Sequence, residues 1–410
     1  MTNTKDSGAG SLRAAIEAAN ARAGADEIVF ADGVGGTITL SSTLPTITDP
    51  EGLAIDGGGD VTVSGNHAVG VFFVAFGAKL DLRNLIVADG AGFVDEFSVL
   101  ERGGGIKNQG TLEITAVTFA GNHAQHEGGA IYSSGRLSIT KSTFSGNSAG
   151  NVNGGSGGAI HNTGFASVVT DSTFSGNSTT TLGGGIYNRG ILGVTNSTFS
   201  GNHAEDAGGA VFHSPPFGFF DESELTLTNS TFSANSAASA GGAIYVYGGT
   251  DGTGITWLFS IRNTVVADSP NGGNCYFDPR LVFGFADDGY NVSDDGTCQF
   301  TEAAGSLSNT DPLLDPEGLQ DNGGLTKTIA LQPDSPAVDL VGEEACPPPE
   351  TDQRGIERPQ GDSCDSGAFE LEQQAEPKTK AECKKGGHKE FGFKNQGQCI
   401  AFVNKAAHGR

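Results

Sequence analysis

The sequence predicts an all-β protein, a single-stranded right-handed parallel β-helix, and three observations favour this fold class. One motif of the form GGAIY…STFSGN is written six times between Gly103 and Pro270. Within each copy, apolar residues alternate with polar ones, as in residues 137–140 (LSIT). Glycine accounts for 64 of the 410 residues without the three-residue period of collagen, which also excludes a helical protein.

The period of the motif indicates a stacked array. Its phenylalanine recurs at steps of 25, 30, 25 and 33 residues, and such periods are typical of solenoids. Alternating runs that end in Gly or Ser/Asn clusters are short strands joined by turns. One copy cannot bury its own apolar face, so successive copies must pair in parallel, about 4.8 Å apart. The side chains expected to stack inside are Phe119, Phe144, Phe174, Phe199, Phe232, Ile131, Ile160, Ile186 and Ile244.

Two other repeat folds do not fit this pattern. A leucine-rich repeat lacks its leucine framework here, and a propeller would need a four-strand period of about 40 residues. The variable steps are turn insertions of a few residues, which a solenoid tolerates because they bulge outward at a corner.

The N-terminal residues predict a cap over the open end of the core. Residues 1–26 are the expected cap segment, with a short helix at 11–22 and Ser11 as its N-cap. Its apolar residues at helical spacing are Leu12, Ile16 and Ala19. Residues 1–10 are polar, so an export signal is expected to precede Met1, and no apolar run is long enough for a membrane span.

The remaining chain divides into four parts. Coils are expected over 27–270, with first strands at 27–30 and 37–40, Val87 in the phenylalanine position of a degenerate coil, and an insertion at 93–102. Residues 271–371 are expected to form the last coils and a disulfide-stapled C-terminal cover, with apolar pieces at 281–283 and 328–331. A polar linker at 372–380 then leads to a small basic, cysteine-containing tail at 381–410.

All six cysteines lie in the last third of the chain. Six cysteines allow fifteen pairings, and the economical choice joins sequence neighbours: Cys275–Cys298, Cys346–Cys364 and Cys383–Cys399. Each bridge would close a loop of about twenty residues, worth on the order of 3 kcal/mol in the loop-entropy model. A zinc site is the alternative, but no Cys/His pair has ligand spacing. Disulfides are therefore favoured, and with them an oxidising compartment.

The charge distribution is uneven. The chain carries a net charge of −25. Residues 377–410 contain eight Lys/Arg and two Glu, which leaves a net charge of −31 on residues 1–376. Such an acidic body repels nucleic acid and anionic membranes, so neither is an expected partner.

Three motifs resemble known exported proteins. The opening DSGAGSLRAAIEAANARAGADEIVF resembles the N-terminal motif of bacterial exported β-helix proteins, and the GGAIYN…STFSGN repeat is similar to polymorphic outer-membrane-protein repeats and the pectate-lyase-like superfamily. The segment from DPLLDPEGLQDNGG to GDSCDSGAFE resembles the closing part of choice-of-anchor Q proteins. Together these motifs span most of residues 4–371. The resemblance implies a right-handed β-helix, a secreted or cell-surface location and some means of surface retention, and it implies no activity.

The candidate ligand site is the column of residues that follows the inward isoleucine. Alternation turns this column away from the core, and its members are Lys107, Tyr132, His161, Tyr187, Phe212 and Tyr245. Aromatic faces stack on sugar rings, so the column predicts binding of an extended polysaccharide or surface glycan. Alternatively, the rings stack on one another, or lie under insertions at 214–223 and 246–256, and merely cover the sheet.

Two further functions remain open. β-Elimination of a uronide needs a base, an acid and a cation, which Tyr132, His161, Tyr187 and Arg189 could supply as catalytic residues of a polysaccharide lyase. Hydrolysis by paired carboxylates is less favoured, because the repeat column Ala116, Lys141, Asp171, Asn196, Asn229 and Asn263 offers one acid. The second alternative is a structural, adhesin-like surface protein without a small ligand.

Two polar patterns have structural explanations. Acidic clusters at 221–224, 287–288 and 294–295 could bind Ca²⁺, but none has EF-hand or nonapeptide spacing, so solvated turns are favoured. The repeated asparagines are predicted to form a hydrogen-bond ladder at a turn: Asn122, Asn147, Asn177, Asn202 and Asn235.

Overall fold

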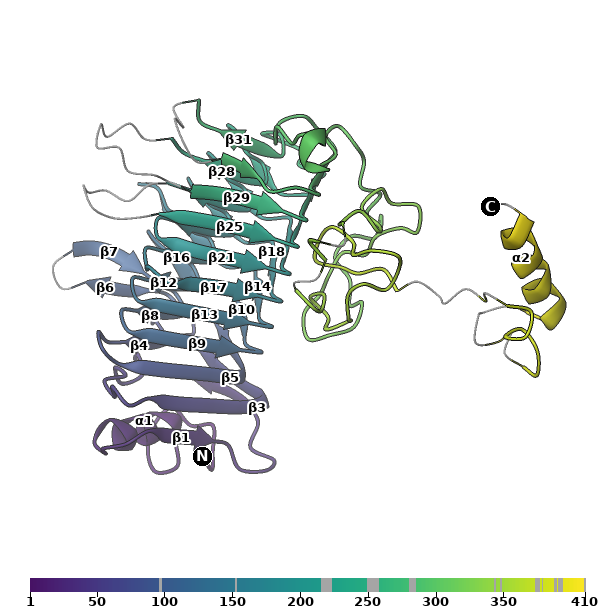
Figure 1. The fold of residues 1–410 in the computed structure, drawn as a ribbon. Helices are drawn as coiled ribbons and strands as arrows, with labels where there is room; N and C mark the ends of the chain where they lie inside the picture. The colour runs from purple at the N-terminus through teal and green to yellow at the C-terminus, as the bar shows by residue number, and fades with distance from the viewer. Residues whose placement is uncertain are drawn as a thin grey trace.

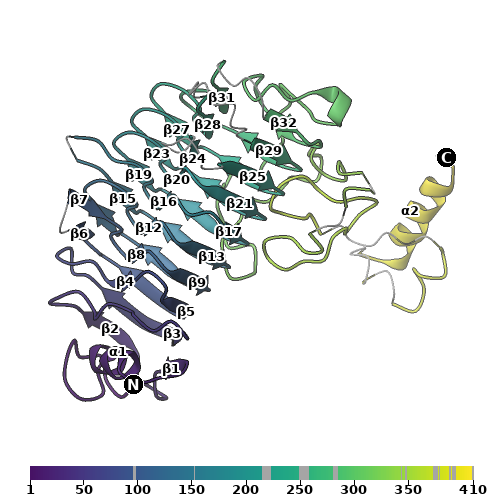
Figure 2. The same cartoon turned by 60° about the vertical axis from the view of Figure 1, so that its left-hand side comes forward.

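The computed structural model shows a stack of coils followed by an irregular segment and a separate tail (Figures 1 and 2). It describes the chain except residues 96–97, 152, 215–222, 249–257, 280–284, 343, 347–348, 373–376, 378, 387–388, 390–393 and 409–410. The predicted strand piece at 281–283 and the acidic residues Asp221 and Glu222 therefore lie outside the described residues.

Each complete coil contributes one strand to an eight-stranded sheet, two to an eighteen-stranded sheet and one to a five-stranded sheet, and neighbouring strands within each are parallel. The eight-stranded sheet comprises β4 (Phe72–Val74), β8 (Ile106–Asn108), β12 (Ile131–Ser133), β16 (Ile160–Asn162), β20 (Ile186–Asn188), β24 (Val211–His213), β28 (Ile244–Val246) and β31 (Cys275–Phe277). The five-stranded sheet comprises β11 (His123–Ala124), β15 (Ser148–Ala149), β19 (Ser178–Thr179), β23 (His203–Ala204) and β27 (Ser236–Ala237).

The eighteen-stranded sheet turns a corner within each coil. Before the corner lie β9 (Thr111–Thr115), β13 (Arg136–Thr140), β17 (Ser167–Thr170), β21 (Ile191–Thr195), β25 (Glu224–Thr228), β29 (Leu258–Arg262) and β32 (Phe285–Asp287). After it lie β10 (Thr118–Ala120), β14 (Thr143–Ser145), β18 (Thr173–Ser175), β22 (Thr198–Ser200), β26 (Thr231–Ser233), β30 (Val265–Ala267) and β33 (Val292–Ser293). The sheet begins with β1 (Asp26–Val29), β2 (Gly36–Thr39), β3 (Leu53–Ser64) and β5 (Lys79–Ala88). We call the outward sides of these two sets of strands the first-strand face and the second-strand face.

The corner explains which residue types recur in the repeat column that was considered as a source of paired carboxylates. Ala116, Lys141, Asp171, Asn196, Asn229 and Asn263 all adopt left-handed backbone conformations, with φ between +46° and +54°. Asn and Asp tolerate this conformation better than most residues, so their recurrence here reflects backbone geometry.

The core contains the predicted stack of phenylalanines. Phe119, Phe144, Phe174, Phe199 and Phe232 are fully buried, with consecutive ring centroids 4.6–4.7 Å apart and nearly parallel planes. Val87 pairs with Phe119 and continues the column downward, as predicted. The four predicted isoleucines of the eight-stranded sheet are buried as well.

The asparagine ladder is confirmed. Asn147 Nδ2 donates to Asn177 Oδ1 at 2.9 Å, and the same bond links each asparagine to the next coil from Asn122 to Asn235. All five side chains are fully buried. These amides satisfy backbone groups at the turn, as in Asn177 Nδ2 to Phe144 O at 3.0 Å, so their role is structural.

Helix α1 (Leu12–Asn20) closes the first coil. Ser11 Oγ accepts a hydrogen bond from the backbone N–H of Ala14, as an N-cap should, and the predicted apolar side chains of the helix are buried. The insertion at 93–102 forms an antiparallel pair, β6 (Phe93–Asp95) and β7 (Ser98–Arg102).

After β33 the chain makes a short 3-10 helix, η1 (Glu302–Ala304), and then runs beside the coils. We call residues 305–371 the C-terminal segment. It lies on the second-strand face: Thr326 Oγ1 donates to Asp171 O at 3.0 Å, and the backbone N–H of Ala368 donates to Thr231 Oγ1 at 2.9 Å. The predicted C-terminal cover is therefore seated on the side of the stack.

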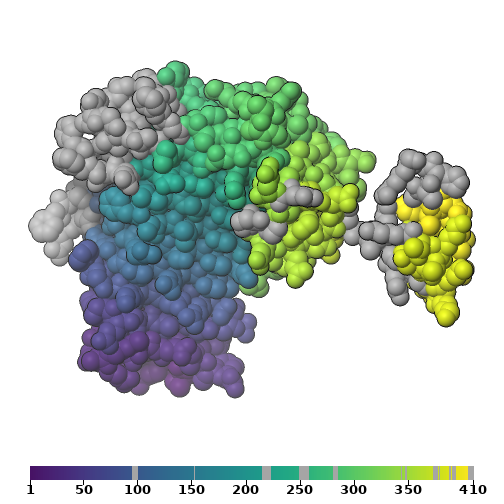
Figure 3. Space-filling view, in the orientation of Figure 1, coloured from purple at the N-terminus to yellow at the C-terminus, as the bar shows by residue number. Residues whose placement is uncertain are grey.

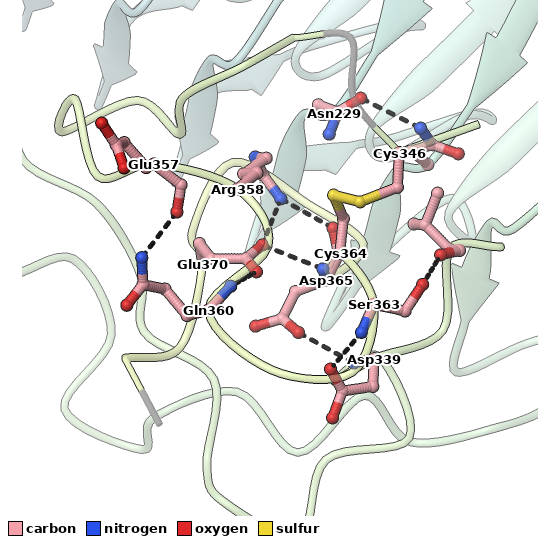
Figure 4. Close-up of a disulfide and its surroundings, with 12 residues drawn as sticks. Asn229, Asp339, Cys346, Glu357, Arg358, Gln360, Ser363, Cys364, Asp365 and Glu370 are labelled. Carbon is pink, nitrogen blue, oxygen red and sulfur yellow. Dashed lines mark hydrogen bonds and ion pairs between the residues drawn. A yellow bond between two sulfur atoms is a disulfide. The ribbon is translucent and has the colours of Figure 1, made fainter. Parts of the chain in front are cut away.

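A buried ion-pair cluster holds the C-terminal segment together (Figure 4). Arg358 Nη1 lies 2.7 Å from Glu370 Oε2, and both side chains are almost fully buried. Arg358 also donates to the carbonyl of Asp365 (2.8 Å), and Glu370 accepts the backbone N–H of the same residue (2.9 Å). These contacts satisfy charges that would otherwise be costly to bury.

The six cysteines form three disulfides, Cys275–Cys298, Cys346–Cys364 and Cys383–Cys399. The last lies in the tail, where both sulfur-bearing residues pack with Val403 of helix α2 (Gln396–His408). Within the described part of the chain, no helix has both the length and the apolar character needed to cross a bilayer.

Candidate functional site

The predicted aromatic column exists as a continuous stack on the outside of the eight-stranded sheet. Tyr132 pairs in register with His161, which pairs with Tyr187. From Tyr132 to Tyr245 the consecutive ring centroids lie 4.7–5.4 Å apart. Tyr276, which the sequence analysis did not include, extends the stack by one coil at 4.8 Å.

Most of this column is buried, so it does not form the open stripe expected of a polysaccharide site. Lys107, His161, Tyr187 and Phe212 are each at most 8% exposed, while Tyr132 and Tyr245 are half-buried. The turn residues Leu182 and Ala207 pack against this part of the stack, and Lys107 Nζ lies 5.2 Å from the centroid of the Phe73 ring. The rings therefore stack on one another and cover the sheet. Most of the insertions proposed to lie over them, 214–223 and 246–256, fall outside the described residues.

Of the four residues proposed for β-elimination, His161 and Tyr187 are buried, whereas Tyr132 and Arg189 are half-buried. The ring of His161 lies between those of Tyr132 and Tyr187, and its Nδ1 is 2.8 Å from Ser156 Oγ. Burial lowers the pKa of His161 to about 4, with the nearby Arg189 charge acting in the same direction. Tyr187 Oη bonds to Ser214 Oγ at 3.2 Å. A neutral imidazole is a competent base, but a polymer cannot reach one that is 3% exposed.

A groove lies instead on the first-strand face, which is turned toward the viewer in Figures 1 and 3. It consists of three adjoining cavities of about 440, 540 and 240 Å³. Thr111 lines all three, and Arg136 and Glu113 each line two of them. The cavity of about 440 Å³ crosses five strands, β9, β13, β17, β21 and β25, so the groove runs along the stack and across successive strands.

Two exposed phenylalanines stand at one side of this groove. Phe76 is 91% exposed and Phe165 is 57% exposed, and both line its cavities. They occupy equivalent corners between the eight-stranded sheet and the first-strand face, three coils apart in the register of the flanking strands. At a strand spacing of about 4.8 Å, three coils correspond to roughly 14 Å.

The corners between the two phenylalanines are shorter, which creates a depression that we call the corner notch. It is formed by Gln109–Gly110 and Ser134–Gly135. A Cβ on Gly135 would lie 2.0 Å from the carbonyl oxygen of Gly110, so only glycine lets these corners lie flush. The exposed side chain of Arg136 follows the second corner and lines the notch.

Corner length was the signal for these phenylalanines. Six residues lie between Asn108 and Thr115, whereas seven lie between the equivalent Asn162 and Thr170. The extra residue makes the corner of Phe165 bulge outward. The corner of Phe76 is longer still, with eight residues between Val74 and Arg83 in the same register.

The C-terminal segment runs beside the groove. Asn196, at the corner between the first-strand and second-strand faces, donates from Nδ2 to Thr351 O at 2.7 Å. The segment therefore reaches the edge of the first-strand face opposite the corner of the two phenylalanines (Figures 1 and 3).

The acidic clusters considered for calcium act as turn acceptors. Asp287 accepts hydrogen bonds from Asn291 Nδ2 and Ser306 Oγ, both at 2.8 Å, and Asp294 accepts the backbone N–H of Asp268 at 2.9 Å. Among the described residues, no three His, Cys, Asp or Glu side chains are grouped closely enough to hold a metal ion.

Comparison with protein families agrees with the parallel coils. A family model described as a right handed beta helix region matches residues 105–283. The coils of this chain form a right-handed parallel β-helix. Comparison with curated proteins gives no match. The matched region includes the corner notch, Phe165 and the aromatic stack up to Tyr276.

Proposed function

We propose that this protein is a secreted or cell-surface β-helix scaffold that binds an extended glycan in the first-strand groove. The observation that carries the proposal is the pair of exposed rings, Phe76 and Phe165, on either side of the corner notch. Exposed apolar surface that is rimmed by polar residues is one mark of a ligand-binding groove.

The arrangement suits a chain of rings. Each phenylalanine offers an aromatic face to the apolar side of one sugar, and their separation of roughly 14 Å leaves room for further sugars between them. Arg136 lies in that interval and can donate hydrogen bonds to hydroxyl groups. The parallel coils make this surface rigid, which lowers the entropic cost of binding an extended ligand.

The proposed location follows from the disulfides. Three disulfides in one chain favour an oxidising compartment. The acidic body adds a reason for solubility at high concentration, because a net charge far from zero opposes association.

The proposal is binding without turnover. His161 and Tyr187 of the candidate lyase set lie in the buried stack, and the residues that line the groove supply no equivalent combination of His, Tyr and Arg. The alternative is a structural protein that binds no ligand, and the binding experiment must distinguish the two.

The test is glycan binding by the full chain, measured by affinity electrophoresis and calorimetry against a polysaccharide panel. Phe76→Ala combined with Phe165→Ala should weaken binding at least tenfold while the circular dichroism stays native, because both side chains are exposed. Val94→Ala, at an exposed apolar residue on β6, is the matched control and should bind normally. Equal binding by the double variant and the native chain would refute the site.

A further inference from the structure

The charges around the first-strand groove indicate which glycans it accepts. Five carboxylates line its cavities, from Asp26, Glu51, Asp81, Glu113 and Glu224, against the two cations Lys79 and Arg136. Two of these carboxylates are paired, Asp26 with Arg22 and Asp81 with Arg83. The other three are not neutralised by any ion pair in the part of the chain that the structure describes.

The positions of the carboxylates matter more than their number. Glu113 is exposed and points outward from β9, directly beside Asp81 on β5 in the parallel register. Neighbouring strands repeat at about 4.8 Å along the groove. A polyuronate carries a carboxylate on every sugar, so a chain lying along the groove would bring its charges against the unpaired carboxylates of Glu113 and Glu224. We call these two residues, with Asp81, whose charge Arg83 already offsets, the acidic row.

The cations are too few to compensate. Arg136 lies next to the corner notch and can face one acidic group of a ligand, and Lys79 lies at the cavity nearest the first coils. The long-range field has the same sign as the acidic row, because residues 1–376 carry a net charge of −31. Polyanions are therefore repelled during approach as well as in the bound state.

We propose that the groove selects glycans without carboxylate or sulfate groups and discriminates against polyuronates. This inference rests on the proposed glycan site and specifies its substrate class. Stacking on Phe76 and Phe165 supplies attraction that is independent of charge, and the carboxylates of Glu113 and Glu224 accept hydrogen bonds from sugar hydroxyls. Neutral sugars gain both interactions without a charge penalty, whereas uronates gain them against the repulsion between their own carboxylates and those of the groove.

The experiment uses the full chain and matched pairs of ligands. Glucan, mannan and galactan hexasaccharides are each compared with their C6-oxidised forms, so that only the carboxylates differ. At low ionic strength we expect the dissociation constant of each oxidised form to be at least tenfold higher than that of its neutral parent. We call this ratio of the two dissociation constants the gap. It should fall with added salt, since screening weakens interactions between exposed charges.

Variants then locate the discrimination. Glu113→Gln with Glu224→Gln should reduce the gap severalfold, because the charges are removed while the amide oxygens can still accept hydrogen bonds from sugar hydroxyls. Glu205→Gln removes an exposed carboxylate on the turn after β23, outside the groove, and is the matched control. A gap that persists in the double variant would overturn the assignment to these residues.

The two proposals fail in distinguishable ways. Equal or tighter binding of the oxidised hexasaccharides at low salt would overturn the charge selection while leaving glycan binding intact. Absence of binding to all six ligands and to the polysaccharide panel would overturn both. Neutral binding that is undiminished by the loss of Phe76 and Phe165 would show that the glycan surface lies elsewhere.

Discussion

Gln353 Oε1 accepts a hydrogen bond from Thr198 Oγ1 at 2.6 Å, although 155 residues separate the two in the sequence. The same amide donates from Nε2 to Thr173 Oγ1 on the previous coil at 2.9 Å. The side chain is 2% exposed, so one buried glutamine connects two coils of the stack to the C-terminal segment.

Replacing Gln353 by Ala should therefore loosen this segment. The change leaves the buried hydroxyl of Thr198 without its partner, which costs about 1–3 kcal/mol when no water replaces it, whereas Thr173 still donates to the carbonyl of Lys327. Hydrogen exchange of residues 320–371 should rise while that of the coils at 103–162 is unchanged. Gln360→Ala, on an exposed side chain of the same segment, is the control. Equal protection in both variants would contradict the docking role.

The buried carboxylate cluster should make the stability of the segment pH-dependent. Burial, followed by the charge of Glu370, raises the pKa of Asp365 to about 7, against roughly 3.9 in an unfolded chain. Between these values the folded state holds a proton that the unfolded state has released. The contribution of Asp365 to the free energy of unfolding is thus greatest below pH about 4 and declines as the pH rises to about 7.

That decline is measurable as a slope of at most about 1.4 kcal/mol per pH unit for one proton. Asp365→Asn should flatten the dependence of the segment's protection on pH over this interval. Its absolute stability should also fall, because both carboxylate oxygens of Asp365 accept backbone N–H groups, from Asp339 and Leu371. An unchanged slope would place the titration on another group.

The buried aromatic column should behave as part of the core. Tyr187→Ala removes a ring that is stacked on both sides and 8% exposed, and large-to-small changes of this kind cost about 3–5 kcal/mol. Tyr187→Phe keeps the stack and removes only the bond to Ser214, so a loss of about 1 kcal/mol is expected. Chemical denaturation measures both, and glycan binding by Tyr187→Phe should be unchanged. Loss of binding without loss of stability would restore the column as a ligand site.

Reduction should act on the last third of the chain. The bridges Cys275–Cys298 and Cys346–Cys364 close loops with sequence separations of 23 and 18 residues, each worth about 3 kcal/mol in the loop-entropy model. Under reducing conditions, hydrogen exchange should increase over residues 275–371 while coils 103–270 stay protected by stacking. A uniform loss of protection would show that the coils themselves depend on the bridges.

The fold could be predicted in detail wherever a residue contacts the equivalent residue of the next repeat. Phe144 stacks on Phe119 and Phe174 because each copy of the motif sits directly on the last, so inspection of one copy gives the contacts of the rest. The asparagine ladder and helix α1 follow from equally local rules.

The site could not be predicted in the same way. The burial of Tyr187 depends on turn residues such as Leu182, which differ between copies, and the contact of Gln353 with Thr198 depends on a segment outside the repeat. Phe165 carried a local signal, since one extra residue at its corner forces the chain outward, but only the register of the flanking strands shows that this corner aligns with that of Phe76.

The glycine corners of the notch fix the distances at which exposed rings can follow one another along the surface. Because Gly110 and Gly135 stack without side chains, any ring displayed by a lengthened corner can stand only at a whole number of coil spacings from the next, about 4.8 Å per step. A single-residue insertion after Arg189 in place of the one at Phe165 would move the second ring by one such step and leave the core untouched. Insertions and deletions at the corners alone would thus change the distance between exposed rings in proteins of this architecture, and with it the length of glycan that spans them.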